Sequence, residues 1–168
     1  MIKLEKPDID VESIITDCTA NLTKQPILTH INASKTTIVS KSEKYNELAE
    51  KGQLGTLETH TMIEGGATKD DMVWLYDNKF VADGGRKYYD KIKAIPKYSK
   101  CPFCGVGIVS TLDHYLPKTK YPTYALTPVN LIACCADCNK NKKSEISETR
   151  NNEFIHPYYD DFNDEVWL

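Results

Sequence analysis

The sequence predicts an α+β protein in which a mainly helical region, residues 1–98, precedes a small zinc-stabilised unit, residues 99–168. Two observations lead to this prediction. Apolar residues in the first part recur at helical spacing. The second part holds two C-x-x-C pairs, which together supply four thiolates, enough for a closed and therefore structural tetrahedral zinc site. The four cysteines of these pairs are Cys101, Cys104, Cys135 and Cys138.

Four helical segments are expected in the first part of the chain. They are a helix after a cap at Asp8 or Asp10, an interrupted or distorted helix over residues 38–50 that ends at Gly52, a helix that opens on a capping box at residues 68–71, and a short helix that Pro96 ends. This part is net acidic and has no cluster of ligand residues. We therefore expect it to dock a partner rather than to carry chemistry.

From residue 100 the pattern changes. A zinc knuckle is expected at residues 101–105, followed by a segment rich in β-formers, residues 108–116, which carries Asp113 and His114. A loop punctuated by prolines comes next, and a short helix then holds the second cysteine pair and Asn139. The predicted order is knuckle, strand, loop and helix.

Composition and charge restrict the class of protein. The chain has 168 residues and a net charge of −3, with no apolar run long enough to span a bilayer and no signal-peptide core at its start. We therefore expect a cytoplasmic protein with no membrane partner. In such a reducing compartment, paired cysteines are metal ligands more often than disulfides. The two remaining cysteines, Cys18 and Cys134, are expected to be small buried apolar residues.

Positive charge is concentrated where the cysteine pairs lie. Residues 85–143 carry 11 Lys and Arg against three Asp, whereas the remainder of the chain is strongly acidic. A basic segment that coincides with the zinc motif suits a polyanionic partner such as nucleic acid, although a solvated lysine-rich surface gives the same count.

The second part of the chain resembles the zinc-bearing branch of the HNH endonuclease family, also called His-Me finger or ββα-metal nucleases. The residues that carry this resemblance are 112–118 (LDHYLPK), 128–131 (PVNL) and 135–142 (CADCNKNK). The resemblance covers about residues 100–143 and implies a ββα-metal finger with a structural zinc held by four cysteines. Residues 112–118 and 154–160 (FIHPYYD) also look like HNH proteins of bacterial anti-phage systems, including Septu-type nuclease subunits that work beside an ATPase.

The resemblance also implies a role for each site residue. His114 is the general base, with activity rising through about pH 6 to 7 as its ring loses a proton. Asp113 and Asn139 are ligands of a catalytic Mg²⁺ or Mn²⁺, and Asn139 stands where many family members have a second histidine. Asn130 ties the loop to the strand and orients the base. Lys140, Lys142 and Lys143 either contact phosphates or form a solvated helix face.

Other residues carry weaker signals. His156 either contacts substrate or caps a turn, whereas His30 and His60 are expected to be ordinary histidines. Five tyrosines are expected to pack around the small zinc core rather than to stack on bases, namely Tyr88, Tyr89, Tyr115, Tyr121 and Tyr124. The chain ends on a strand-like apolar run, residues 166–168, which we expect either to continue in a longer protein or to dock on the helical part.

The expected function is metal-dependent hydrolysis of phosphodiester bonds in nucleic acid, DNA more than RNA, as the effector of an anti-phage system with a separate ATPase sensor subunit. Two alternatives stay open. One is a non-catalytic zinc module that binds nucleic acid or a partner protein. The other is a tRNA-cleaving, toxin-like ribonuclease on the same scaffold.

Overall fold

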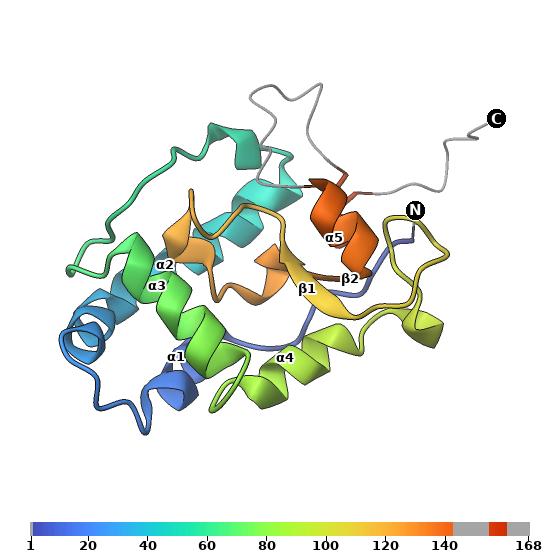
Figure 1. Ribbon diagram of the computed structural model, residues 1–168. Coiled ribbons are helices and arrows are strands. Elements are labelled where there is room, and N and C mark those ends of the chain that lie inside the picture. Colours follow the sequence, from blue (N-terminus) through green and yellow to red (C-terminus); the bar gives the residue numbers. More distant parts are fainter. Residues whose placement is uncertain (1, 143–154, 161–168) are drawn as a thin grey trace.

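The computed structural model describes residues 2–142 and 155–160, and in these residues helices surround one small two-stranded sheet (Figure 1). The α+β class expected from the sequence is confirmed. The helices are α1 (Val11–Thr19), α2 (Ile27–Glu50), α3 (Lys69–Leu75), α4 (Arg86–Lys93) and α5 (Ala136–Lys142), and the strands are β1 (Thr111–His114) and β2 (Leu131–Cys134).

Helices α1 and α3 begin at the caps that the sequence predicts. The Asp10 carboxylate accepts a hydrogen bond of 2.7 Å from the Ser13 N–H. Thr68 and Asp71 form a reciprocal capping box, in which each side chain accepts from the backbone N–H of the other residue. Both caps satisfy N–H groups that the first turn of a helix leaves without a partner. A π-helical turn over Tyr76–Phe80 then continues α3.

The expectation of an interrupted helix over residues 38–50 is wrong, because α2 runs without a break from Ile27 to Glu50. The apolar pattern breaks where Ser34 and Ser42 occupy buried positions on this helix. Both hydroxyls have partners. The Ser34 oxygen accepts from the Ala67 N–H at 3.0 Å, and the Ser42 hydroxyl donates to the Thr127 oxygen at 3.0 Å. These serines join α2 to loops that pass over it, so the break in apolar pattern marks contacts rather than a helix end.

A glycine allows one of these loops to touch the helix backbone. At Gly65, φ is +102°, and a Cβ atom built there would lie 2.4 Å from the Ala33 carbonyl oxygen. Any other residue at position 65 would therefore have to push the loop away from α2.

Strands β1 and β2 pair antiparallel, with Thr111 opposite Cys134 and His114 opposite Leu131. The order predicted from the sequence, knuckle, strand, loop and helix, did not include β2 as a separate strand. All four residues of β2 are buried, so the strand shows no alternation of apolar and polar residues. Helices α4 and α5 flank the strand pair (Figure 1), and the described elements of the second part follow in the order β1, β2, α5.

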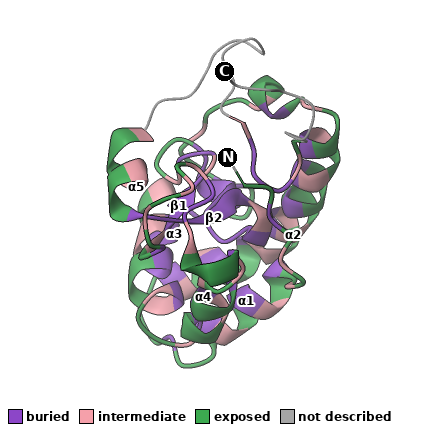
Figure 2. Ribbon diagram, turned by 90° about the vertical axis from the view of Figure 1, so that its right-hand side faces the viewer, coloured by how far each residue is buried: buried purple, intermediate pink, exposed green. Residues whose placement is uncertain are grey.

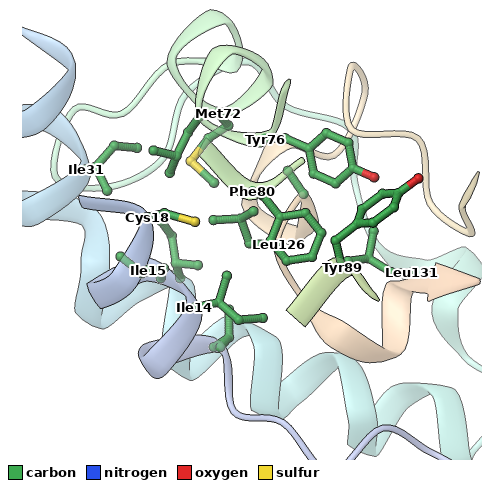
Figure 3. Close-up of a cluster of buried hydrophobic side chains, with 14 of the residues drawn as sticks. Ile14, Ile15, Cys18, Ile31, Met72, Tyr76, Phe80, Tyr89, Leu126 and Leu131 are labelled. Carbon is green, nitrogen blue, oxygen red and sulfur yellow. The ribbon is translucent and has the colours of Figure 1, made fainter. Parts of the chain in front are cut away.

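The main hydrophobic core does not divide at residue 98. One buried cluster joins Ile14 and Ile31 of the first two helices with Phe80 and with Leu131 of β2 (Figure 3). The division into residues 1–98 and 99–168 therefore stays a prediction about the roles of the two parts. The core that stabilises them is shared.

The extended N-terminal segment also crosses between the two parts. The Ile2 N–H donates to the Pro102 carbonyl at 2.8 Å, and the Leu4 N–H donates to the Pro157 carbonyl at 2.9 Å. Leu4 is buried against Ile132. By contrast, α5 has no fully buried residue and lies at the surface (Figure 2).

Among the described helices, none combines the length and the apolar character needed to cross a membrane. Lys143 and the apolar run at residues 166–168 lie outside the described residues, as does the start of the FIHPYYD segment.

Candidate functional site

The four cysteines of the C-x-x-C pairs meet at one point, as the sequence predicts. Their sulfur atoms all lie within 4.8 Å of one another. The Cys104 and Cys135 sulfurs are 3.9 Å apart. A tetrahedron with zinc–sulfur bonds of about 2.3 Å has edges of about 3.8 Å, so the spacing fits a zinc ion. The chain can therefore hold one structural zinc through Cys101, Cys104, Cys135 and Cys138.

Backbone N–H groups donate hydrogen bonds to two of the four cysteine sulfurs. The Gly107 N–H donates to the Cys104 sulfur at 3.3 Å, and the Cys138 N–H donates to the Cys135 sulfur at 3.5 Å. The hydrogen bond from Gly107 is the main cause that lowers the pKa of Cys104 to about 6. A Cβ atom at position 107 would lie 2.9 Å from the Cys135 sulfur, so a larger residue there would have to displace Cys135 or the knuckle backbone.

The two cysteines outside the pairs are buried, as expected. Cys18 is 1% exposed and Cys134 is 0% exposed. Burial raises the pKa of each thiol to about 12, so both stay protonated. Cys134 is the immediate neighbour of Cys135 and is not one of the four clustered cysteines.

His114 lies at the end of β1 with its ring held in one orientation. Its Nε2 atom is 3.0 Å from the Ala125 carbonyl oxygen, which can only accept. Nε2 therefore carries the proton, and Nδ1 of the neutral ring keeps its lone pair. Burial lowers the pKa of His114 to about 3. The expected rise in activity through pH 6 to 7 does not fit this pKa, because the ring is neutral throughout that range.

Asn130 is completely buried and uses its amide in four hydrogen bonds. Its nitrogen donates to the Leu116 and Tyr124 carbonyls at 3.1 and 3.0 Å. Its oxygen accepts from the Leu116 N–H at 2.7 Å and from the Tyr45 hydroxyl at 3.1 Å. Because Tyr124 precedes Ala125, the amide fixes the segment whose carbonyl orients His114.

The sequence left two roles open for His156, contact with substrate or capping of a turn. Its surroundings in the structure are those of a residue that caps a turn. It is 3% exposed, and its backbone N–H donates to Asp160 at 2.6 Å, which closes a turn. Its Nδ1 accepts from the Tyr158 N–H at 3.3 Å, and its Nε2 lies 3.2 Å from the Tyr45 hydroxyl. Tyr45 of α2 therefore links this turn to Asn130. No local pattern in the sequence signals that role.

Asp113 forms a buried ion pair with Lys142, which comes from the last turn of α5. The Lys142 nitrogen is 2.7 Å from the Asp113 carboxylate, 2.7 Å from the His114 carbonyl and 3.2 Å from the Tyr115 carbonyl. Burial raises the pKa of the Asp113 carboxyl, while the lysine acts in the opposite direction. Lys142 was expected at the phosphates or in solvent. Lys142 follows Asn139 by three residues and Cys138 by four, so the three residues lie on one face of the helix. This spacing was the signal in the sequence that Lys142 faces the strand.

Asn139 lies on the same helix and is half-buried, and its backbone N–H donates to the Cys135 carbonyl at 3.1 Å. Within the described residues, its side chain makes no hydrogen bond to Asp113. The oxygen atoms that surround the Lys142 ammonium already accommodate a positive charge. Carboxylate and carbonyl oxygens are also the ligands of hard divalent cations, so the donor set at Asp113 fits Mg²⁺ or Mn²⁺.

The remaining histidines have local partners away from this site. His30 pairs with Asp71 at 2.9 Å, and His60 lies 2.6 Å from the Thr123 hydroxyl oxygen. Both contacts serve the packing of loops on helices.

Replacing Asn130 by alanine should reduce the free energy of unfolding by about 2–4 kcal/mol, because buried partners of the amide would lose their hydrogen bonds. Replacing Tyr45 by phenylalanine removes only the hydroxyl from the same network and should cost about 1 kcal/mol. Urea unfolding of the zinc-loaded protein measures both. A smaller loss for Asn130→Ala than for Tyr45→Phe would contradict the central position given to Asn130.

Comparison with known proteins shows similarity to protein ea31 of Escherichia phage lambda. The two sequences are 31% identical over 170 residues, which cover 95% of this chain and 57% of the phage protein. The chain thus spans a little over half the length of that relative, whose name states no activity. No family model matches the chain. No solved structure matches it.

Proposed function

We propose that this protein is a zinc-bearing HNH endonuclease that hydrolyses phosphodiester bonds in nucleic acid. The observation that carries the proposal is His114, whose ring is neutral and hydrogen-bonded through Nε2 to the Ala125 carbonyl. Such a ring has a free lone pair at Nδ1, and His114 directly follows Asp113 in β1, where the surroundings of the Asp113 carboxylate accept a cation. Phosphodiester hydrolysis needs both a general base and a cation site, and β1 supplies a candidate for each.

The order of the surrounding elements supports the same proposal. A cysteine pair precedes β1, the second pair lies at the start of α5, and β2 lies between them. This order supports the proposal of a ββα-metal finger, in which zinc would hold the two ends together. The helix would then present Asn139 on the side of the strand that ends at Asp113 and His114.

The proposed roles of His114, Asn130 and Asp113 draw on their contacts, and the proposed role of Asn139 rests on the sequence resemblance. His114 accepts a proton from the attacking water at Nδ1. Asn130 acts through the Tyr124–Ala125 segment and keeps the ring in position. Asp113 and Asn139 would hold a Mg²⁺ or Mn²⁺ ion, which supplies positive charge for the phosphate and for the leaving oxygen when it is bound.

The substrate and partner proposals rest on the sequence resemblance. DNA is proposed over RNA, and the biological role is that of an effector in anti-phage defence beside an ATPase sensor subunit. The helical part, residues 1–98, is the proposed docking region for that subunit. The basic charge of residues 85–143 supports binding to a polyanion.

One observation favours a second candidate, a zinc module without catalysis. The residues proposed for chemistry are largely buried, with His114 8% exposed and Asp113 9% exposed. In such surroundings the Asp113 carboxylate can serve the packing of α5 on β1, and the His114 ring can serve the packing of β1 against Tyr76 and Ala125. Catalysis and packing make different predictions for variants that preserve the fold.

The zinc-loaded protein should cleave nucleic acid only when Mg²⁺ or Mn²⁺ is added. The test incubates it with plasmid DNA, single-stranded DNA and tRNA, after a mild chelator wash that leaves zinc in place. Asp113→Asn and Asn139→Ala should each lower cleavage at least about 100-fold, because the first removes the negative charge and the second removes the amide oxygen from the proposed cation site.

Matched controls lie on the surface of the same helix. Asp137→Asn and Asn141→Ala change exposed residues of α5 and should leave cleavage close to that of the wild type. Zinc content is measured for every variant. Full cleavage in excess chelator with zinc retained would contradict the need for a catalytic cation. If the wild type cleaves none of the substrates, the non-catalytic zinc module becomes the better explanation.

A further inference from the structure

The Lys142–Asp113 pair differs from the other ion pairs of the described residues in its burial. The side chains of Lys142 and Asp113 are 8% and 11% exposed. In the pairs that Lys79 and Lys118 form with aspartates, the carboxylate is 56% and 53% exposed. Surface pairs of that kind contribute little to stability, whereas a buried charge is costly unless its partners satisfy it.

The ammonium of Lys142 has its full set of partners. A lysine ammonium has three N–H donors, and three oxygen atoms surround this one, namely a carboxylate oxygen of Asp113 and the carbonyls of His114 and Tyr115. The end of β1 is therefore a complete oxygen-lined cation site, and the chain fills it with a charge of its own.

A divalent cation held by Asp113 would share the carboxylate that the Lys142 ammonium already contacts. A hard cation is held by carboxylate and carbonyl oxygens at about 2.0–2.6 Å, so it would lie within a few ångströms of the ammonium nitrogen. Two positive charges at such a separation repel each other strongly in a site with little water. They cannot both occupy the end of β1.

We infer that Lys142 is the resting occupant of the cation position at Asp113, and that the divalent cation binds only as Lys142 leaves. This inference deepens the proposed function and rests on its catalytic cation. Lys142 thereby sets the cation affinity of the site. In the resting state it also keeps the Asp113 carboxylate paired, so that the fold does not depend on the divalent cation.

The test measures Mn²⁺ binding to the full-length, zinc-loaded protein by calorimetry and by the loss of the free-ion electron paramagnetic resonance signal. Mn²⁺ is suitable because it binds such ligands more weakly than zinc does and leaves the thiolate site occupied. Lys142→Met keeps the length of the side chain without its charge. It should bind Mn²⁺ about tenfold or more tightly than the wild type, because no ammonium has to be displaced.

Thermal unfolding gives a second measure. In the zinc-loaded protein without added Mn²⁺, Lys142→Met should unfold at a lower temperature than the wild type, because its Asp113 carboxylate is buried and unpaired. Mn²⁺ should restore much of that loss. If Lys142→Met does not fold, Lys142→Gln provides the same comparison. Lys140→Met, a change at an exposed lysine on the same helix, should behave as the wild type in both measurements.

The outcomes separate this inference from the proposed function. If Lys142→Met binds Mn²⁺ as well as or more weakly than the wild type, and Asp113→Asn still loses binding, the inference about Lys142 is wrong. The proposed cation site at Asp113 would then still stand. An absence of Mn²⁺ binding in the wild type and in every variant would overturn both. A gain in affinity that disappears in the Lys142→Met, Asp113→Asn double variant supports exchange at this site.

Discussion

His114→Ala is expected to lower cleavage by about two to four orders of magnitude, the usual effect of removing a positioned proton acceptor. Zinc content and nucleic-acid binding should be almost unchanged, because the imidazole contacts neither the cysteine sulfurs nor an exposed basic surface in the proposed scheme. Single-turnover cleavage of plasmid DNA in saturating Mg²⁺, compared at equal zinc content, measures this effect.

A second substitution separates basicity from hydrogen bonding. His114→Gln keeps an N–H that can donate to the Ala125 carbonyl but offers no base, so it should fold normally and be as inactive as His114→Ala. His60→Ala, a change at a histidine remote from the site, should retain activity. Near wild-type cleavage by His114→Gln would contradict the role of His114 as the general base and would favour the non-catalytic zinc module.

The pKa of His114 also predicts the pH profile. A histidine with a folded-state pKa of about 3 is neutral at any higher pH, so it contributes no rise in activity between pH 6 and 8. The same depressed pKa reduces stability in acid. The unfolded chain binds a proton near pH 6.5 and the folded chain does not, so the free energy of unfolding falls as pH decreases below that value.

Loss of a zinc ligand should have the largest effect on the fold. Cys135→Ser is expected to reduce bound zinc from about one ion per chain to near zero. Structural zinc supplies on the order of 10 kcal/mol in small modules, which is comparable to the total stability of a domain. Elemental analysis and near-ultraviolet circular dichroism should report loss of zinc and loss of tertiary packing together.

The neighbouring cysteine is the matched control. Cys134→Ser changes the same atom in the preceding residue of the chain, at a buried position outside the zinc cluster. It should keep zinc and lose only the modest stability of a buried thiol, about 1–2 kcal/mol. Retention of zinc by Cys135→Ser together with its loss from Cys134→Ser would mean that the ligand register is wrong.

The sequence predicted the four clustered cysteines because spacing alone determines them. Two residues between cysteines bring both thiolates of a pair to one metal, and the same spacing distinguishes Cys135 from Cys134. The caps of α1 and α3 were predictable for a similar reason, since capping uses contacts between residues three apart.

Contacts between distant residues could not be predicted in this way. Ser34 and Ser42 lie in the core-facing positions of α2 because loops far along the chain supply their hydrogen-bond partners, and no local pattern reveals such partners. The hydrogen bond from Tyr45 to Asn130 joins residues that are 85 positions apart in the sequence. Burial of Lys142 depends on how α5 packs on β1, which sequence spacing suggests but does not determine.

The shared apolar core has a consequence for how this sequence can be rearranged. Phe80 and Ile14 pack in the same cluster as Leu131, only four residues before Cys135. A segment cut at residue 98 and grafted onto another protein would carry its zinc ligands but expose the face of its sheet that these helices cover. The smallest unit that can be transferred to another protein therefore includes the helices. Recombination within this chain would be tolerated only where both recombined sequences preserve the residues of that face.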